Sequence, residues 1–292
     1  MVAIRNHLFC FGLGYCAKTL TQGLAREQWS ISGTSRTPRP ATSDLTMHAF
    51  DGGSPIADAE SAFDRVTHIL ASAAPGDHGD PVLNWHSEDI AKMTSLKWVG
   101  YLSTTGVYGD TDGAVVDETA QPQPSSKRSQ NRLQAELAWM HLLETSAVPV
   151  HIFRLPGIYG PGRSALDQVL AGKARRIDKP GHQFSRIHVD DIARTLIKSI
   201  DNPNPGRIYN VCDDEAASPA DVTAFACQLL QKPVPDLIPF EIARQSMSPM
   251  ALSFWQDNRR VTNGRIKSEL AVQLRYPTYR EGLTSIYGEM TG

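Results

Sequence analysis

The stretch His7-Leu-Phe-Cys-Phe-Gly-Leu-Gly-Tyr-Cys-Ala17 decides the fold of this chain. Its apolar part, Leu-Phe-Cys-Phe, is typical of a strand that is buried on both faces of a sheet. The strand ends in a G-x-G-x-x-A sequence, and a helical pattern over residues 18–28 follows it directly. A strand, a glycine turn and a helix in this order favour dinucleotide binding over a glycine turn with a purely structural role.

Each small residue of this turn has a separate physical role. Gly12 allows the tight turn, Gly14 lets a diphosphate approach the backbone, and Ala17 lets the helix pack closely on the strand. The helix presents free N–H groups and the positive end of its dipole to the phosphates. Tyr15 and Cys16 lie inside the turn, so we count them among the cofactor-binding residues. We also expect the helix N-terminus to lower the pKa of the Cys16 thiol.

Composition excludes several classes of partner. The 292 residues include 29 Lys and Arg against 31 Asp and Glu, and the formal net charge of −2 gives no case for nucleic acid or an anionic membrane. No apolar run approaches the length that spans a bilayer, and the start of the chain leaves no room for a signal peptide. The four cysteines lack metal-ligand spacing, and we predict no metal site. We therefore expect a cytoplasmic protein.

Strand and helix patterns alternate along the first half of the chain. This alternation predicts right-handed βαβ units, and hence an α/β fold with a Rossmann-type, doubly wound parallel sheet. The expected strands are residues 8–11, 29–34, 47–50, 67–74, 98–102 and 150–154, and the expected helices are 18–28, 56–63, 81–95 and 125–144.

The pattern loosens after Leu155, and turns such as Tyr159-Gly-Pro-Gly162 become frequent. We therefore predict an NAD(P)-binding Rossmann domain over residues 1–155 and a smaller C-terminal lobe on the substrate side over 156–292. A segment around residues 184–211 is expected to return to the Rossmann sheet.

Six separated motifs occur in an order that points to one family. In this sequence they read Gly12-Leu-Gly-Tyr-Cys-Ala17, Leu70-Ala-Ser-Ala-Ala74, Ser103-Thr-Thr-Gly-Val-Tyr-Gly109, Arg154-Leu-Pro-Gly-Ile-Tyr-Gly-Pro-Gly162, Arg186-Ile-His-Val-Asp-Asp191 and Arg207-Ile-Tyr-Asn-Val211. With them the chain resembles the extended and atypical short-chain dehydrogenases/reductases, the NAD-dependent epimerase/dehydratase group, which acts largely on nucleotide-sugars.

The end of the second strand indicates which cofactor is bound. An acid there favours NAD, whereas an arginine accommodates the extra phosphate of NADP. The sequence reads Thr34-Ser35-Arg36 with Arg39 close by and no acid, which favours NADP(H) over NAD(H). A solvated surface arginine is the alternative interpretation of Arg36.

The resemblance implies further cofactor contacts. Asp51 would lie near the adenine, although an aspartate before Gly52-Gly53 is also a common turn former. Ala71, Ser72 and Ala73 would run along the central part of the cofactor. Pro156, Gly157 and Ile158 would border the nicotinamide.

The catalytic pattern of the family breaks in this chain. The resemblance implies a Ser/Thr that holds the substrate oxygen, for which Thr104 is the candidate, and a Tyr-x-x-x-Lys pair at the start of the long helix. The best register puts Arg128 in place of the tyrosine and Arg132 in place of the lysine, and no tyrosine in the chain precedes a lysine by four. Arginine does not give up its proton, so Arg128 is no general acid, while Arg132 can still hydrogen-bond the nicotinamide ribose. Glu136, one turn further, can offset the charge of Arg132.

Other residues are candidates for the missing acid or for substrate contact. Tyr108, Tyr159 and His188 lie in motifs that line the substrate side in relatives, although each is more often structural, His188 as a cap of the helix that starts at Val189. Arg163 and His188 are the candidate substrate contacts.

Two functions therefore compete. The first is an NADP(H)-dependent oxidoreductase or epimerase-like protein that acts on a small sugar-like or carbonyl substrate with a non-standard active site. The second is a non-catalytic NADP(H)-binding sensor or regulatory protein, which the missing tyrosine favours. The resemblance also implies a homodimer that pairs the helices at 81–95 and 125–144.

Overall fold

The computed structural model describes residues 6–25, 27–37 and 45–292. Its centre is a parallel sheet of seven strands in the order β11-β7-β5-β4-β1-β2-β3. These strands are β1 (Asn6–Phe11), β2 (Trp29–Ser35), β3 (Leu45–Ala49), β4 (His68–Ala71), β5 (Trp98–Thr104), β7 (Val150–Leu155) and β11 (Ile208–Asn210). The predicted doubly wound parallel sheet is confirmed.

The strand order reverses beside β1, which pairs with β2 on one side and β4 on the other. In an open sheet of this kind the connections after the two central strands lead to opposite faces of the sheet, which leaves a crevice for a ligand just outside the carboxyl ends of these strands. β11, from the segment around 184–211, extends the sheet beyond β7. The predicted division of the chain at residue 155 stays a prediction.

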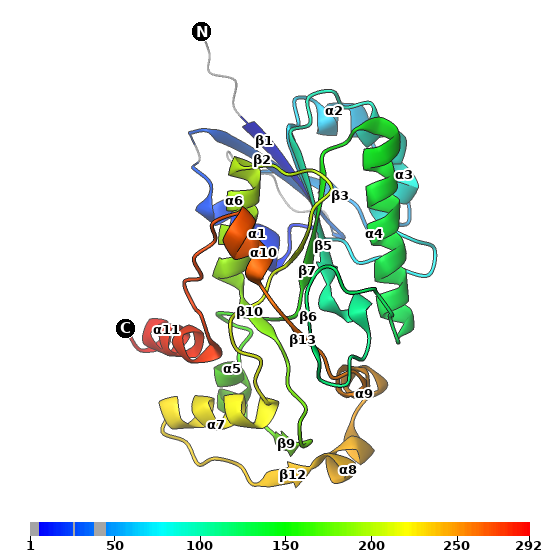
Figure 1. Ribbon diagram of the computed structural model, residues 1–292. Helices are drawn as coiled ribbons and strands as arrows, with labels where there is room; N and C mark the ends of the chain where they lie inside the picture. The colour runs from blue at the N-terminus through cyan, green and yellow to red at the C-terminus, as the bar shows by residue number, and fades with distance from the viewer. Residues whose placement is uncertain (1–5, 26, 38–44) are drawn as a thin grey trace.

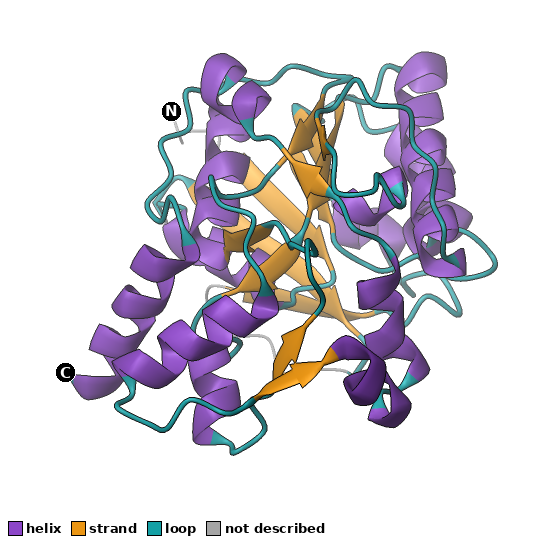
Figure 2. Ribbon diagram, turned by 60° about the horizontal axis from the view of Figure 1, so that its bottom comes forward, coloured by secondary structure: helices purple, strands orange, loops and turns teal. Residues whose placement is uncertain are grey.

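Helices cover both faces of the sheet (Figures 1 and 2). The periodicity of the strands explains why, since Leu8 and Cys10 join one apolar core while Phe9 and Phe11 join the other. One face carries α1 (Tyr15–Gly23), α6 (Val189–Asp201) and α10 (Gly264–Glu269), and the other carries α2 (Ala59–Phe63), α3 (Pro81–Ala91) and α4 (Lys127–Ser146).

The C-terminal part lies beyond the carboxyl ends of the strands (Figure 1). Its helices are α5 (Ala165–Leu170), α7 (Pro219–Leu229), α8 (Phe240–Ala243), α9 (Pro249–Gln256) and α11 (Tyr279–Thr291). Three two-stranded parallel sheets join β8 (Gly157–Tyr159) to β10 (Arg186–His188), β9 (Arg176–Asp178) to β12 (Leu237–Pro239), and β6 (Val115–Val116) to β13 (Arg260–Val261). Two 3-10 turns, η1 (Thr105–Tyr108) and η2 (Arg244–Ser246), complete the elements.

The first helix differs from its prediction at both ends. It begins at Tyr15 rather than residue 18, because Gly14 is already its N-cap, and it ends at Gly23 rather than residue 28. Leu24 adopts an extended conformation and packs into the core beneath the sheet, which stops the helix there. The helix predicted for 81–95 likewise ends early, at Ala91.

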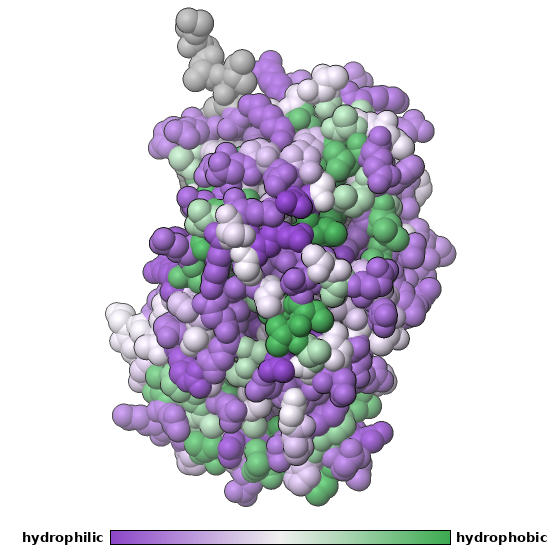
Figure 3. Space-filling view, in the orientation of Figure 1, coloured by the Kyte–Doolittle hydropathy of each residue, from purple (hydrophilic) through white to green (hydrophobic). Residues whose placement is uncertain are grey.

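No helix in the described part of the chain is both long and apolar enough to cross a membrane. Large exposed apolar side chains occur on β12, α8 and α9, at Leu237, Ile242, Met250 and Phe254. Figure 3 shows hydrophobic side chains among polar ones at the lower end of one face, where β12 and α8 lie.

Candidate functional site

A cavity of about 420 Å³ opens at the carboxyl ends of the central strands. It is large enough for a drug-sized ligand or for part of a dinucleotide. The predicted site residues that line it are Gly14, Tyr15, Cys16, Ser72, Thr104, Arg128, Arg132, Pro156, Gly157, Ile158 and Arg163. These residues come from five separate stretches of sequence, and only the fold brings them together.

The glycine turn has the shape that a diphosphate requires. Gly12 has a φ of +86°, and a Cβ added to it would lie 2.9 Å from Oγ of Ser72, so a larger residue is excluded. Nothing lies within 4 Å of the position where a Cβ on Gly14 would stand, so this part of the backbone is open to a ligand. Gly14 caps α1 without a side chain, which leaves the first-turn N–H groups available to an anion. The residues present therefore fit a bound diphosphate.

Hydrogen bonds from neighbouring strands fix the turn. The N–H of Gly12 donates to Oγ1 of Thr34 at 2.8 Å, and Oγ of Ser72 donates to the carbonyl oxygen of Gly12 at 2.6 Å. Ala17 is buried, as the predicted close packing of helix on strand requires. Ser72 therefore both lines the cavity and holds the turn.

Tyr15 and Cys16 join the turn to the C-terminal lobe. The hydroxyl of Tyr15 donates to the carbonyl oxygen of Pro161 at 3.0 Å. The expectation of a lowered thiol pKa is wrong, because burial raises the pKa of Cys16 to about 11 and outweighs the opposing charge of Arg163. Cys16 is therefore a protonated thiol at neutral pH, which gives it no special reactivity.

The residues predicted for the adenosine end lie outside the cavity lining. Arg36 follows β2 directly, is exposed, and has no hydrogen-bond or ion-pair partner within the described ranges. Oγ of Ser35 donates to the carbonyl oxygen of Thr37 at 2.5 Å. Asp51 is exposed and accepts a hydrogen bond from the N–H of Gly53 at 2.8 Å, as a turn former does. Arg39 lies outside the described residues.

Two of the predicted central residues flank Ser72. Ala71 is buried at the end of β4, and Ala73 is half-buried just beyond it.

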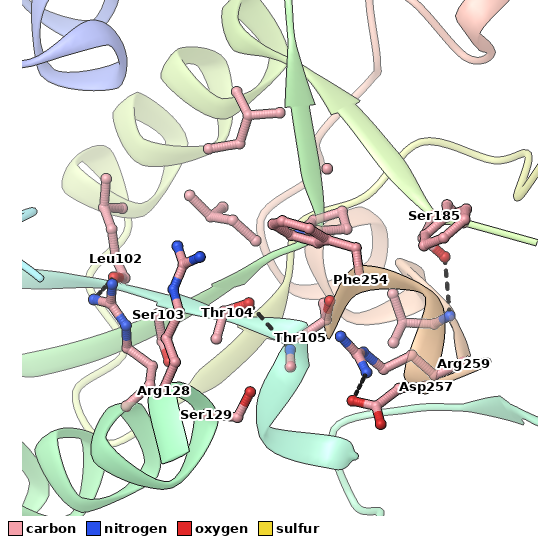
Figure 4. Close-up of a pocket in the computed structure, with 18 of the residues that line it drawn as sticks. Leu102, Ser103, Thr104, Thr105, Arg128, Ser129, Ser185, Phe254, Asp257 and Arg259 are labelled. Carbon is pink, nitrogen blue, oxygen red and sulfur yellow. Dashed lines mark hydrogen bonds and ion pairs between the residues drawn. The ribbon is translucent and has the colours of Figure 1, made fainter. Parts of the chain in front are cut away.

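Thr104 and Arg132 both line the cavity, and Figure 4 shows Thr104 at the end of β5. Oγ1 of Thr104 accepts the N–H of Gly106 at 3.1 Å, which leaves the hydroxyl hydrogen free to donate to a ligand. Nη1 of Arg132 donates to the hydroxyl of Tyr101 at 3.1 Å and to the carbonyl oxygen of Leu102 at 2.9 Å. Arg132 is therefore held in place.

Arg128 has a different environment from Arg132, although both lie on one face of α4. Its side chain lines the cavity, is exposed, and makes no hydrogen bond or ion pair with the part of the chain that is described. An unpaired guanidinium in a cavity is a binding position for an anion.

None of the three alternative acids lines this cavity. Tyr108 is buried, its hydroxyl donates to Oδ1 of Asn210 at 2.8 Å, and its ring lies under the Arg154 guanidinium. His188 is also buried and caps α6 by accepting the N–H of Asp190, and burial lowers its pKa to about 4. Tyr159 lies in the C-terminal lobe, beside the ring of His188.

The structure corrects the predicted partner of Glu136. Glu136 does not offset Arg132; its carboxylate is buried and receives hydrogen bonds from Nε and Nη2 of Arg154, the shortest at 2.7 Å. The hydroxyl of Ser103, which lines the cavity, donates to the same carboxylate.

The sequence did not point to the far wall of the cavity, which comes from the C-terminal lobe. Oγ of Ser125 donates to the Asp257 carboxylate at 2.7 Å, and Arg259 pairs with that carboxylate at 2.7 Å and donates to the carbonyl oxygen of Gly109 (Figure 4). Phe254, from α9, adds an aromatic surface. Asp257 is 132 positions from Ser125 and Arg259 is 150 positions from Gly109, and no local motif marks these contacts.

Positive charge dominates the cavity. Its lining includes Arg128, Arg132, Arg163 and Arg259, whereas Asp257 is its one acid among the residues that the structure describes. Because Asp257 already pairs with Arg259, the remaining arginines favour anionic ligands.

Comparisons with known proteins agree with this geometry. The model of the NAD dependent epimerase/dehydratase family matches residues 13–212. The chain is 27% identical over 215 residues to Protein YeeZ of Escherichia coli K12, which covers 69% of this chain and 75% of that protein.

Solved structures are also similar. A functionally unknown conserved protein from Silicibacter pomeroyi has a TM-score of 0.88 at 45% identity, covering 98% of this chain and 100% of that one. A UDP-glucuronic acid 4-epimerase from Bacillus cereus in complex with UDP-glucuronic acid and NAD has a TM-score of 0.79 at 17% identity, covering 97% and 98% of the two chains, which shows a shared fold.

Proposed function

Because the chain belongs to the NAD dependent epimerase/dehydratase family, we propose that it binds NADP(H) and acts as an oxidoreductase or epimerase-like enzyme on a small sugar-like or carbonyl substrate that carries an anionic group. One observation carries the proposal: the open glycine turn, Thr104, Arg132 and the segment at 156–158 line a single cavity. A dinucleotide whose diphosphate binds at the turn would extend along this lining toward Thr104.

The preference for NADP(H) rests on Arg36. Its guanidinium stands at the end of β2, has no partner in the described ranges, and has no acid beside it in sequence. A planar guanidinium matches the geometry of a phosphate oxygen pair. The 2′-phosphate of NADP would supply the missing partner.

The other side chains have separable roles in the proposed site. The bound cofactor supplies hydride chemistry at its nicotinamide. Arg132, fixed by Tyr101 and Leu102, would hold the ribose, and the free hydroxyl hydrogen of Thr104 would donate to the substrate oxygen. Arg128 would bind the anionic group of the substrate. Asp257 is already bound by Arg259 and Ser125, so we propose that water exchanges the proton.

Calorimetric titration with NADPH and NADH tests the cofactor assignment. We expect NADPH to bind more tightly, and Arg36→Ala to weaken NADPH binding by about 10- to 100-fold while leaving NADH binding unchanged, because one charged hydrogen-bonding partner is lost. Lys92→Ala, which removes an exposed charge directly after α3, is the matched control. Absence of heat and of a melting shift with both nucleotides would overturn the proposal.

The second candidate is a non-catalytic NADP(H)-binding sensor, which the replacement of the family tyrosine by Arg128 favours. Turnover separates the two. The change in NADPH absorbance reports net oxidation or reduction, and chromatography of the substrate reports redox-neutral epimerisation, each with a panel of sugar nucleotides, aldehydes and ketones. Tight NADPH binding without turnover on any member of the panel would select the sensor.

A further inference from the structure

A second cavity, of about 390 Å³, lies in the C-terminal lobe among α5, α7 and α11. It shares only Arg163 with the lining of the first cavity. Half of its lining residues are aromatic or aliphatic, and it contains one largely buried cation. The residues on which the inference rests are Tyr159, Arg186, Val222, Tyr279 and Leu283.

The Arg186 guanidinium uses only part of its hydrogen-bonding capacity. Nη1 donates to the carbonyl oxygens of Phe184 at 2.8 Å and Ala217 at 2.9 Å. Nε and Nη2 donate no hydrogen bond to the described residues. Neither of these nitrogens is among the fully buried side-chain atoms that lack a hydrogen-bond partner in the described chain. Both nitrogens therefore keep some solvent accessibility, and Arg186 lines the second cavity.

The Arg186 guanidinium forms no ion pair with the described residues. Glu215, an acid nearby, pairs with Arg280 instead. Asp213 interacts with Arg186 electrostatically without forming an ion pair, and burial raises the pKa of its carboxyl. A guanidinium so placed is incomplete without an anion.

Another arginine of this molecule binds a carboxylate with the edge that Arg186 leaves free. Arg154 uses its Nε and Nη2 to hold the Glu136 carboxylate, with Nη2 to Oε2 at 2.7 Å. The same two nitrogens are the ones that Arg186 leaves free. One such edge receives the two oxygens of one carboxylate.

We propose that the second cavity is a binding site for a small monocarboxylate with an aromatic or branched aliphatic body. The carboxylate would lie on the Nε–Nη2 edge of Arg186, and the body would pack against Val222, Tyr279 and Leu283. A single negative charge matches the single buried guanidinium, while Arg163 stands exposed at the junction with the first cavity. This site goes beyond the proposed function, because it does not require NADP(H) to bind.

Ligand-observed NMR and calorimetry on the whole chain test the site with benzoate and 3-methylbutanoate as probes. We expect dissociation constants of about 0.1–1 mM, the range for ligands of so few atoms. Benzyl alcohol, which has the ring without the charge, should bind at least about tenfold more weakly, because a charged hydrogen-bonded pair is lost. Equal binding of benzyl alcohol would overturn the carboxylate assignment, and tighter binding of phenyl phosphate would assign the edge to a phosphate.

Two variants locate the probe. Arg186→Lys keeps the charge and removes the two-pronged edge, and Val222→Trp fills the apolar part, so both should abolish benzoate binding. Leu170→Trp, at an exposed position of α5 outside the cavity, is the matched control and should bind benzoate as the parent does. If Arg186→Lys does not fold, Val222→Trp still decides.

Unchanged benzoate affinity in Val222→Trp, or no binding by the parent, would overturn the proposal. NADPH titration of the same samples keeps the two sites apart. Displacement of benzoate by NADPH would place the probe in the first cavity and contradict the second site. If the parent binds benzoate but not NADPH, the result contradicts the proposed function and leaves the second site standing.

Discussion

At the scale of single residues, Arg128 and Arg132 show how neighbouring groups give two identical side chains different roles. They lie four positions apart on α4, and both line the first cavity. Arg132 is held by the Tyr101 hydroxyl and a backbone carbonyl, whereas Arg128 has no partner in the described chain. A held cation can position a cofactor, and a free one can recruit an anion.

The Arg154–Glu136 pair yields a stability prediction at the same scale. Both side chains are almost fully buried, each with 2% relative exposure. Arg154→Met leaves the Glu136 carboxylate buried with only the Ser103 hydroxyl as partner, so we expect a loss of about 3–5 kcal/mol in unfolding free energy by denaturant titration.

The matched control for this pair is the double replacement Glu136→Met with Arg154→Met. It removes both charges together and should cost less than Arg154→Met alone, since no uncompensated charge stays buried. A cost below about 1 kcal/mol for Arg154→Met would contradict the buried ion pair.

At the scale of elements, the turn after η1 holds the far wall of the first cavity. The Gly109 carbonyl oxygen accepts from Arg259 at 3.1 Å, and Arg259 in turn pairs with Asp257 just beyond α9. The end of η1 and the segment between α9 and β13 are thereby connected across the cavity mouth. The shape of the proposed substrate side depends on this one backbone position.

Gly109→Ala should disrupt that connection. Gly109 has a φ of +70°, and an added Cβ would lie 1.9 Å from the carbonyl oxygen of Gln123. Backbone strain and overpacking together predict a loss of about 3 kcal/mol in unfolding free energy. Gly264→Ala, at the first position of α10 with nothing within 4 Å of its Cβ, is the control and should change stability by less than about 0.5 kcal/mol. Equal stability of the two variants would disprove this role of Gly109.

At the scale of the whole molecule, buried histidines make the fold sensitive to acid. Burial lowers the pKa of His68, His151, His182 and His188 from 6.5 to about 4. Between these values the unfolded chain binds more protons than the folded one, so stability rises with pH over this window. The slope is about 1.4 kcal/mol per pH unit for each histidine.

Asp213 acts in the opposite sense. Its pKa rises from 3.8 in the unfolded chain to about 8 in the folded one, so the folded protein binds the extra proton and stability falls as pH rises through this range. Below pH 6.5 the four histidines outweigh Asp213, so stability rises with pH. Above pH 6.5 only Asp213 of these groups still titrates, so stability falls as pH rises. We therefore expect greatest stability near pH 6.5, measured by denaturant unfolding from pH 4 to 8.5.

The variant Asp213→Asn isolates the alkaline limb of this curve. It should remove the decline in stability between about pH 6.5 and 8 and leave the acid limb in place. A parent that is equally stable at pH 6.5 and 8 would show that Asp213 is ionised in the folded state.

The sequence by itself determined the parts of this protein that local chemistry governs. The run Leu8-Phe-Cys-Phe11 predicted a strand buried on two faces, and the small residues after it predicted a tight, open turn before a helix. The alternation of strands and helices then required the parallel sheet. Helix ends were less accurate, because Leu24 leaves α1 to reach the core, a contact that no local pattern contains.

Only the tertiary structure decided which charges are free and which are paired. Glu136 is close to Arg132 in sequence but pairs with Arg154, and Asp257 meets Arg259 and Ser125 to form a wall that no motif marks. Burial reversed the expected shift of the Cys16 pKa. The physical reason is the same in each case, because charge pairing and desolvation depend on distances between residues that the chain places far apart and folding brings together.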